Sequence, residues 1–175
     1  FVSGNAVRYF FAQLNAQDLT FPESMTCWSP GPGTSQALRC QGISDQSIIQ
    51  PTPDAPQFDS ESLWDQAQHH IRSGHQVLIV RGGDGQEAAG HGRPWLTKQL
   101  QQRGVQVHFA PVYERQAPPI TPALLQTIET LRAQQAQWLF SSSECVQHLV
   151  HCNPAWSWQP HTAWATHPRI AQQAR

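Results

Sequence analysis

The run Gln76-Val77-Leu78-Ile79-Val80 gives the clearest indication of the fold. Four apolar residues stand together in it, three of them β-branched, and a glycine-rich stretch that begins at Gly82 follows closely. A continuous apolar run of this kind is typical of a parallel strand that is buried on both faces of a sheet. We therefore expect a buried strand here, with helices packed on both sides of it.

Strand and helix patterns alternate outward from this run in both directions. Apolar residues recur at helical spacing in several segments, each of which opens on a residue that favours a helix start. Such alternation is typical of the α/β class, with parallel sheets and right-handed crossovers. We expect strands at 1–2, 27–29, 76–80, 105–112, 137–140 and 163–166, and helices that begin at Ser3 or Asn5, Thr34, Ser60, Pro94, Thr121-Pro122, Ser141 and Pro168.

The length of 175 residues suits one ordinary domain or two small ones. The stretch Ala117-Pro118-Pro119 is the best candidate for a connection between two lobes, since stiff prolines suit exposed linkers. We expect one lobe at 1–112 and another at 113–175. Phe1-Val2 reads as the end of a strand and the last helix has no stop signal, so further elements are expected before Phe1 and after Arg175.

Composition excludes several classes of function. The formal net charge is -1 and charged residues make up 13%, so there is no basic field for nucleic acid or an acidic membrane surface. No apolar run approaches the roughly 18 residues of a membrane span, and no secretory signal opens the chain. The four cysteines form no CxxC pair, which favours reduced thiols, packed as small buried hydrophobes, in a cytoplasmic protein.

Four small polar turns follow the expected strands. In α/β sheets, ligands bind outside the carboxyl ends of strands, where helix N-termini offer free backbone N–H groups to an anion. Each turn alone could simply cap a helix, but four together predict a site for a small anion. The turns are Ser3-Gly4-Asn5, Pro32-Gly33-Thr34, Arg81-Gly82-Gly83-Asp84-Gly85 and Ser141-Ser142-Ser143, and Arg81 is the cation that could pair with a carboxylate or phosphate.

Two other chemistries have weaker support. Gly83-x-Gly85-x-x-Ala88 resembles a dinucleotide fingerprint, but further glycines and Pro94 separate it from the next helix. The group Cys145, His148, His151 and Cys152 resembles a metal cluster, yet at most three of these share one helix face, so packed cysteines and surface histidines are the better interpretation. A serine hydrolase is not indicated, since G-x-S-x-G is absent.

Tyr113 directly follows the expected strand 105–112, near the expected crossing between lobes. A phenol can donate a proton to a leaving hydroxyl without a cofactor. An amphipathic aromatic residue at a domain boundary is the alternative interpretation.

The ordered set of motifs resembles the uroporphyrinogen-III synthase family over essentially the whole chain. The resemblance implies two lobes of parallel sheet flanked by helices and joined by a β-ladder hinge, with 1–112 as the middle lobe and 113–175 as part of an incomplete split lobe. The matching segments are Phe1-Val2-Ser3-Gly4-Asn5-Ala6-Val7, Gly31-Pro32-Gly33-Thr34, Leu78-Ile79-Val80-Arg81-Gly82 with Trp95-Leu96, Val112-Tyr113-Glu114-Arg115, Leu139-Phe140-Ser141-Ser142-Ser143-Glu144 and Ala165-Thr166-His167-Pro168-Arg169-Ile170-Ala171.

This resemblance also implies a reaction. The family closes the linear tetrapyrrole hydroxymethylbilane into uroporphyrinogen III with inversion of the last pyrrole ring, and it uses neither a metal nor an organic cofactor. Its substrate carries eight carboxylates, which suits donor-rich turns. We expect a cytoplasmic monomer that receives the bilane from the preceding deaminase, and we expect the 175-residue chain alone to be inactive. A two-lobe module that only binds anions, or a nicotinamide enzyme using the Gly82 to Gly85 turn, are the alternatives.

By the same resemblance, Tyr113 matches the tyrosine that assists loss of the hydroxyl. Ser3, Thr34 and Ser141 fall on cleft positions, and backbone N–H groups for the carboxylates come from Gly4, Asn5, Gly33, Gly82, Ser142 and Ser143. The late family motif often has a Gly-Pro-Thr-Thr-like turn, whereas this chain has His167-Pro168-Arg169-Ile170. Arg169 is therefore expected to replace a hydroxyl contact as a carboxylate partner.

Overall fold

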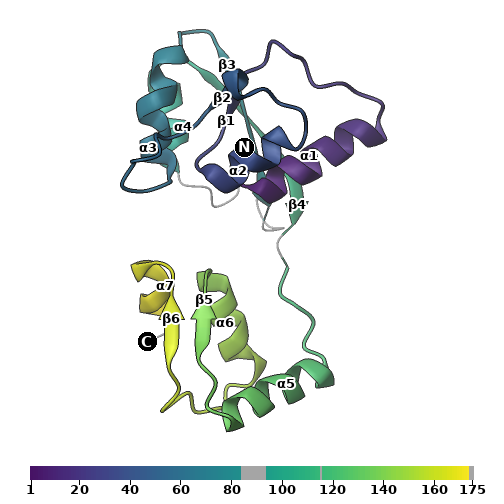
Figure 1. Ribbon diagram of the computed structural model, residues 1–175, viewed down its shortest axis with the longest axis vertical. Helices are drawn as coiled ribbons and strands as arrows, with labels where there is room; N and C mark the ends of the chain where they lie inside the picture. The colour runs from purple at the N-terminus through teal and green to yellow at the C-terminus, as the bar shows by residue number, and fades with distance from the viewer. Residues whose placement is uncertain (84–93, 115, 174–175) are drawn as a thin grey trace. The chain divides into compact units, whose positions relative to one another are not determined.

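The computed structural model describes residues 1–83, 94–114 and 116–173. The chain separates into two compact units, Phe1–Arg115 and Gln116–Arg175, shown in Figure 1. The strand expected to end at Val112 continues to Glu114, and the division accordingly falls after Arg115. Unit 1 below means the first of these and unit 2 the second.

Unit 1 alternates short strands with helices. Most elements are short. Among the described strands of this unit, β1 and β2 have two residues each, and β3 and β4 are longer. The elements in chain order are α1 (Gly4–Ala16), β1 (Cys27–Trp28), α2 (Pro32–Arg39), the 3-10 turn η1 (Asp45–Ser47), β2 (Ile48–Ile49), α3 (Ser60–Ala67), the 3-10 turn η2 (Gln68–His70), β3 (Gln76–Gly83), α4 (Pro94–Gln102) and β4 (Gln106–Glu114). The pair β2 and η1 was not predicted from the sequence.

The strands of unit 1 form two parallel pairs, β1 with β2 and β3 with β4. The first two residues join these pairs, because the Phe1 nitrogen donates to the Trp28 carbonyl at 2.9 Å and the Val2 N–H donates to the Val80 carbonyl at 3.1 Å. Hydrogen bonding therefore orders the segments as β2, β1, residues 1–2, β3, β4. Chain order reverses at residues 1–2, which makes that position the switch point where doubly wound sheets bind ligands.

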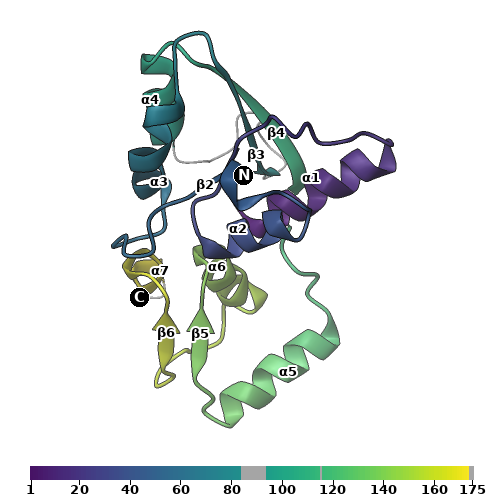
Figure 2. The ribbon, with the colours of Figure 1, turned by 45° about the horizontal axis from the view of Figure 1, so that its top comes forward.

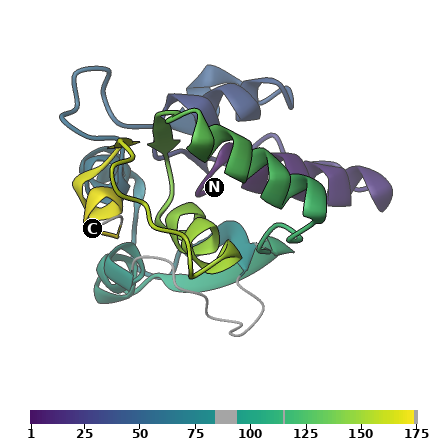
Figure 3. The same cartoon turned by 90° about the horizontal axis from the view of Figure 1, so that it is seen from below.

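Helices cover both sides of these strands, as Figures 1, 2 and 3 show. On one side, α1 and α2 pack with β1 around Val7, Phe11, Cys27 and Leu38. On the other side, α3 and α4 pack around Trp64, Leu100 and Val105 against β3 and β4. Burial raises the pKa of the Cys27 thiol.

The buried strand predicted at 76–80 is present as β3, but its two faces are covered unequally. Val80 is buried, whereas Leu78 is 47% exposed beside the exposed His108, its partner in register. The prediction of burial on both faces is therefore wrong for the start of the strand. Val80 lies two residues farther along the same face, where α1 contacts β3 and the Val2 N–H donates to the Val80 carbonyl.

Several helix starts differ from prediction by a few residues. Ser3 and Thr121 cap α1 and α5 (Pro122–Ala133) as predicted, each accepting a backbone N–H at 3.2 Å. Gly31 rather than Thr34 precedes α2, because Pro32 fixes the first helical turn and needs no N–H partner. Asp59 rather than Ser60 caps α3, where its carboxylate accepts the Ser62 N–H at 2.9 Å.

Unit 2 is smaller and less buried. It contains α5, β5 (Trp138–Phe140), α6 (Ser143–Cys152), β6 (Ala163–Ala165) and α7 (Pro168–Gln173), and β5 pairs with β6 in parallel. Its buried apolar residues are Ile128, Val146 and Ile170. Residues 116–121, which connect the units, have no regular secondary structure, so the β-ladder hinge stays a prediction.

The cysteines differ from prediction as well. All four are free, but only Cys27 is buried, while Cys40 and Cys145 are exposed. The interpretation as buried hydrophobes is thus wrong for these two positions. None of the helices in the described residues has the length and apolar character needed to cross a membrane.

Candidate functional site

Two of the predicted turns of unit 1, together with Tyr113, meet at the switch point of its sheet. Ser3 directly follows residues 1–2, and Gly82 lies near the end of the neighbouring strand β3. Tyr113 comes from β4 and is the register partner of Gly82, after a register shift between Arg81 and Gly82. A β-bulge of this kind redirects the side chains that follow it. The carboxyl ends of three adjacent segments thus converge on one point.

The Tyr113 ring depends on the absence of a side chain at Gly82. A Cβ atom built on Gly82 would lie 2.6 Å from ring carbons of Tyr113 and 2.9 Å from its hydroxyl. Such distances are far shorter than van der Waals contact, so only glycine leaves room for the ring here. The Tyr113 hydroxyl lies 3.5 Å from the Ser3 hydroxyl, and either oxygen could donate. This separation exceeds that of a strong O–H···O bond, and the phenolic proton is not fixed on Ser3.

Tyr9 also belongs to this group, although the sequence did not indicate it. Its ring stacks on the Tyr113 ring, with centroids 5.2 Å apart and planes inclined by 28°. The signal available in the sequence was the position of Tyr9 on α1, the helix that Ser3 caps.

A cavity of about 500 Å³ opens beside Ser3. Five of the predicted residues line it, from the first turns of α1 and α2, which meet there: Ser3, Gly4, Asn5, Gly33 and Thr34. The two helices approach closely, since a Cβ on Gly4 would lie 3.5 Å from the Gly33 carbonyl. Two helix N-termini at one cavity provide partial positive charge and free N–H groups for an anion. Its other lining residues are Val2, Arg8, Pro30, Gly31, Pro32 and Phe58.

Arg8 supplies a formal positive charge to this cavity. Its side chain is exposed and donates to the side-chain oxygen of Asn5. Sequence reasoning did not select Arg8, although its spacing of three residues from Asn5 and four from Gly4 places all of them on one face of the helix. A guanidinium can bind a carboxylate in a bidentate manner.

Arg81, which was expected to offer its charge to a ligand, is placed differently. It is only 5% exposed, and its guanidinium lies 4.7 Å from the centre of the Phe109 ring. Arg81 points to the side of β3 that faces α3 and α4, and it does not line the cavity. Arg81 is therefore not part of this cavity, because its position in β3 turns its side chain toward the face that α3 and α4 cover, and its role as an anion partner stays a prediction.

The remaining predicted residues lie in unit 2, at the carboxyl edge of its two strands. Ser141 follows β5 and is exposed, while Ser142 is the N-cap of α6 and accepts the Glu144 N–H at 3.2 Å. The predicted capping box with Ser141 as cap is therefore wrong by one residue. Ser143 is half-buried, and its hydroxyl makes no hydrogen bond within the described residues. Arg169 is exposed in α7, which contacts α6.

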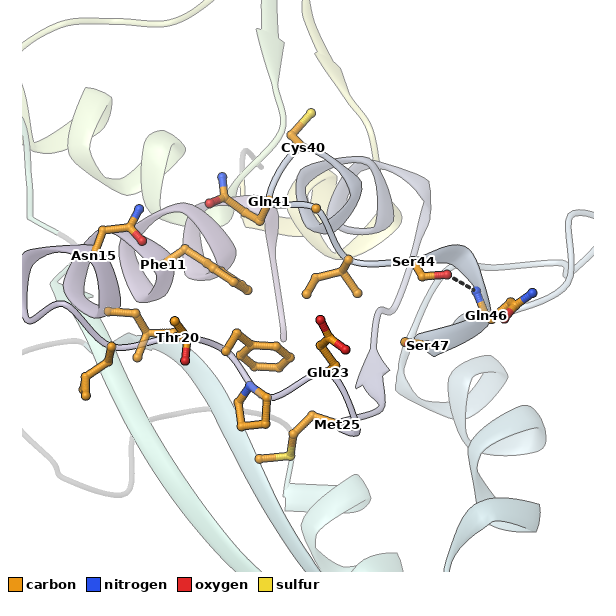
Figure 4. Close-up of a pocket in the computed structure, with 16 residues that line it drawn as sticks. Phe11, Asn15, Thr20, Glu23, Met25, Cys40, Gln41, Ser44, Gln46 and Ser47 are labelled. Atoms are coloured by element: carbon orange, nitrogen blue, oxygen red, sulfur yellow. Dashed lines mark hydrogen bonds between the residues drawn. The ribbon is translucent and has the colours of Figure 1, made fainter.

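A second and larger cavity, of about 730 Å³, lies at the other end of α1 and is shown in Figure 4. Phe11 and Asn15 line it together with Glu23, whose carboxylate points inward, whereas Cys40 points away. None of the residues predicted from the sequence lines it. We place the candidate site at the smaller cavity, because the phenol and the helix N-termini lie there.

The nicotinamide interpretation finds little geometric support. Gly83 is the last residue of β3 rather than part of a turn that opens a helix. Gly85 and Ala88 lie outside the described residues. Within residues 1–83, 94–114 and 116–173, no group of three or more His, Cys, Asp or Glu side chains is placed to hold a metal ion.

Comparison with known proteins identifies the family of this chain. No curated protein sequence matches this chain. A solved structure of Thermus thermophilus uroporphyrinogen III synthase is similar at 17% identity and a TM-score of 0.48, and the alignment covers 100% of this chain and 67% of the other. The family model described as Uroporphyrinogen-III synthase HemD matches residues 1–175, and the chain therefore belongs to the uroporphyrinogen-III synthase family.

Proposed function

We propose that Tyr113 is the acid of the cyclisation reaction and that the cavity beside Ser3 holds carboxylates of the substrate. As a member of its family, the protein is a lyase of haem biosynthesis that closes hydroxymethylbilane into uroporphyrinogen III. The observation that carries the proposal is the position of Tyr113. Its hydroxyl reaches the switch point of the sheet, 3.5 Å from Ser3, in a space that only a glycine at position 82 leaves open.

The chemistry assigned to Tyr113 is a single proton transfer. The phenolic O–H proton passes to the leaving hydroxyl of the bilane, the carbon–oxygen bond breaks and water departs. The bilane becomes a protonated azafulvene, and the substituted α-carbon of the last pyrrole ring attacks its methylene carbon to give a spiro intermediate. The bond from that α-carbon to its original methylene bridge then breaks, and the bridge rejoins the ring at its free α-carbon, which inverts the ring. A proton lost later from the macrocycle restores the phenol. The sum of these steps is loss of one water, so no external oxidant or reductant is needed.

Placement of the bilane is assigned to the donors around the cavity. Backbone N–H groups of Gly4, Asn5 and Gly33 at the two helix starts, with the hydroxyls of Ser3 and Thr34, are suited to carboxylates. Arg8 adds a guanidinium at the rim. The role of Gly82 is to leave room for Tyr113. We propose that a second set in unit 2, made of Ser141, Ser142, Ser143 and Arg169, binds further carboxylates, and that the purpose of both sets is to hold the bilane curled.

The same proposal includes the setting of the reaction. We infer that the protein works as a cytoplasmic monomer, without a metal or organic cofactor, on bilane handed over by the preceding deaminase. The four free cysteines support a reducing compartment. The substrate class supports the absence of a cofactor, since proton transfer and placement suffice for a dehydrating ring closure.

Replacement of the Tyr113 hydroxyl tests the assignment. In the natural-length protein, Tyr113→Phe should lower kcat by roughly 10²- to 10⁴-fold, the usual contribution of a positioned acid, with KM nearly unchanged. Gln106→Ala, an exposed change at the start of the same strand, serves as the matched control. Chromatography of the oxidised products separates the type III isomer from the type I isomer that forms spontaneously. An unchanged rate of type III formation in Tyr113→Phe would remove Tyr113 from the mechanism, and binding of bilane without any type III product would indicate a binding module instead.

A further inference from the structure

Tyr9 is an exposed aromatic residue whose ring stacks on another tyrosine. It lies on α1 and is 50% exposed, so it is not part of the apolar core. Its ring stacks on Tyr113 at 5.2 Å with an inclination of 28°. The chain has only two tyrosines, and the fold brings them together from segments about a hundred residues apart.

The helix α1 contacts Tyr113 at two places. Ser3, the N-cap of α1, faces the Tyr113 hydroxyl at 3.5 Å, and Tyr9, from the same helix, contacts the ring. A helix is stiff over this length, so the two contacts keep a fixed spacing. The ring and the hydroxyl of Tyr113 are thus both contacted from one rigid helix and its cap.

The neighbourhood of Gly82 explains why this second contact matters. Gly82 leaves space for the ring but has no side chain that could restrict its rotation. The Tyr113 ring is half-buried, and besides Gly82 its neighbours are the Tyr9 ring, on which it stacks, and the Ser3 hydroxyl. The stack with Tyr9 is thus placed to hold the ring in the orientation in which its hydroxyl points toward Ser3.

We propose that Tyr9 is a positioning residue for the reaction, which acts by holding the Tyr113 phenol in its productive orientation. This inference rests on the proposed role of Tyr113 as the acid. A displacement of about 1 Å in a reacting group can cost roughly a hundredfold in rate, so a ring held only by its own torsions would be a poorer acid. The ring of Tyr9 performs this task and its hydroxyl is dispensable.

The test compares three variants of the full-length protein. Tyr9→Ala should lower kcat by roughly ten- to a hundredfold while KM changes little. Tyr9→Phe keeps the ring and should restore nearly the full rate. Tyr9→Leu fills part of the volume without a stackable ring, and its kcat should stay low. Gln13→Ala, an exposed position on the same helix, is the control for general effects on α1.

A double-mutant cycle separates positioning from a merely structural role. In the Tyr113→Phe background there is no phenolic proton to position, so Tyr9→Ala should cause no further loss of kcat. An additive loss in that background would overturn the inference, as would a full rate in Tyr9→Ala or a slow Tyr9→Phe. Thermal melts of every variant show whether each is folded, and Tyr9→Phe and Tyr9→Leu keep the comparison usable if Tyr9→Ala is not.

Failure of this inference is distinguishable from failure of the proposed function. If Tyr113→Phe keeps the parent rate, the role of Tyr113 fails and the role of Tyr9 falls with it. If Tyr113→Phe is slow while Tyr9→Ala is as fast as the parent, only the role of Tyr9 is overturned.

Discussion

The two units are built from the same local pattern but bury it to different degrees. In unit 1, residues 1–2 join two strand pairs, and helices lie on both sides around Leu38 and Leu100, each fully buried. In unit 2, a single pair of short strands exposes Leu139 to 73% and Trp164 to 59%, and these two residues are partners in register. The same sequence pattern of strand, polar turn and helix start therefore forms the same local structure in both units. The burial of its apolar side chains depends in addition on how many strands are joined in the sheet.

The polar turns of the two units also differ in the functional groups that surround them. The turn after residues 1–2 lies at a switch point, where a phenol from β4 and a cavity with two helix starts adjoin it. The turn after β5 has a helix cap and an exposed serine, and an exposed arginine, Arg169, lies farther along the chain in α7. Unit 1 therefore has the geometry to position a reacting group, and the polar residues of unit 2 are suited to binding carboxylates.

Two leucines give the largest expected effect and test the contrast directly. Leu38→Ala should lower the free energy of unfolding of unit 1 by about 2–5 kcal/mol, because Leu38 is fully buried. Leu139→Ala should change the stability of unit 2 by no more than about 0.5 kcal/mol, because its side chain is mostly exposed. Hydrogen exchange of peptides from α2 and β5 reports each unit separately. A cost of several kcal/mol at Leu139 would show that its face is covered in solution.

The sequence was sufficient for the class of fold and for most elements. The strand at 76–80 and the helix caps Ser3 and Thr121 are confirmed. These features depend on residues that are neighbours in the sequence, and a sequence pattern therefore suffices to predict them. Predictions failed where a competing residue stood nearby. Pro32 moved the start of α2 away from Thr34, and Asp59 took the cap position from Ser60. Exposure of Leu78 could not be predicted, since it depends on which helices cover the sheet.

The candidate site was only partly predictable, for a related reason. Ser3, Gly33 and Thr34 lie on turns that the sequence marks, and they do line one cavity. Arg81 does not line that cavity, because its side chain points to the face of β3 that α3 and α4 cover, and the turn sequence alone does not indicate which face that is. Tyr9 was missed because its stack with Tyr113 joins segments far apart in the chain.

The two glycines of the site give the next largest effect. Gly82→Ala should destabilise unit 1 by about 1–3 kcal/mol and displace the Tyr113 ring, because the new Cβ would lie 2.6 Å from it. Gly33→Ala meets no atom within 4 Å and should be neutral, or stabilising by up to about 1 kcal/mol, since it lies in α2. Chemical denaturation measures both changes.

A second substitution identifies the cause of the Gly82 effect. In a Tyr113→Ala background the ring is absent, and Gly82→Ala should then cost much less. An equal cost in both backgrounds would mean that Gly82 is needed for the backbone rather than for the ring.

The smallest expected effect compares two adjacent serines of unit 2. Ser142 accepts the Glu144 N–H as the cap of α6, whereas Ser141 is exposed and does not cap the helix. Ser142→Ala should therefore cost about 1 kcal/mol, and Ser141→Ala should change stability by no more than about 0.5 kcal/mol. Hydrogen exchange in the first turn of α6 measures the difference. If Ser141→Ala proved the more costly, the cap would lie where the sequence first suggested, and the turns of the two units would be equivalent after all, with the first serine after the strand capping the helix in both.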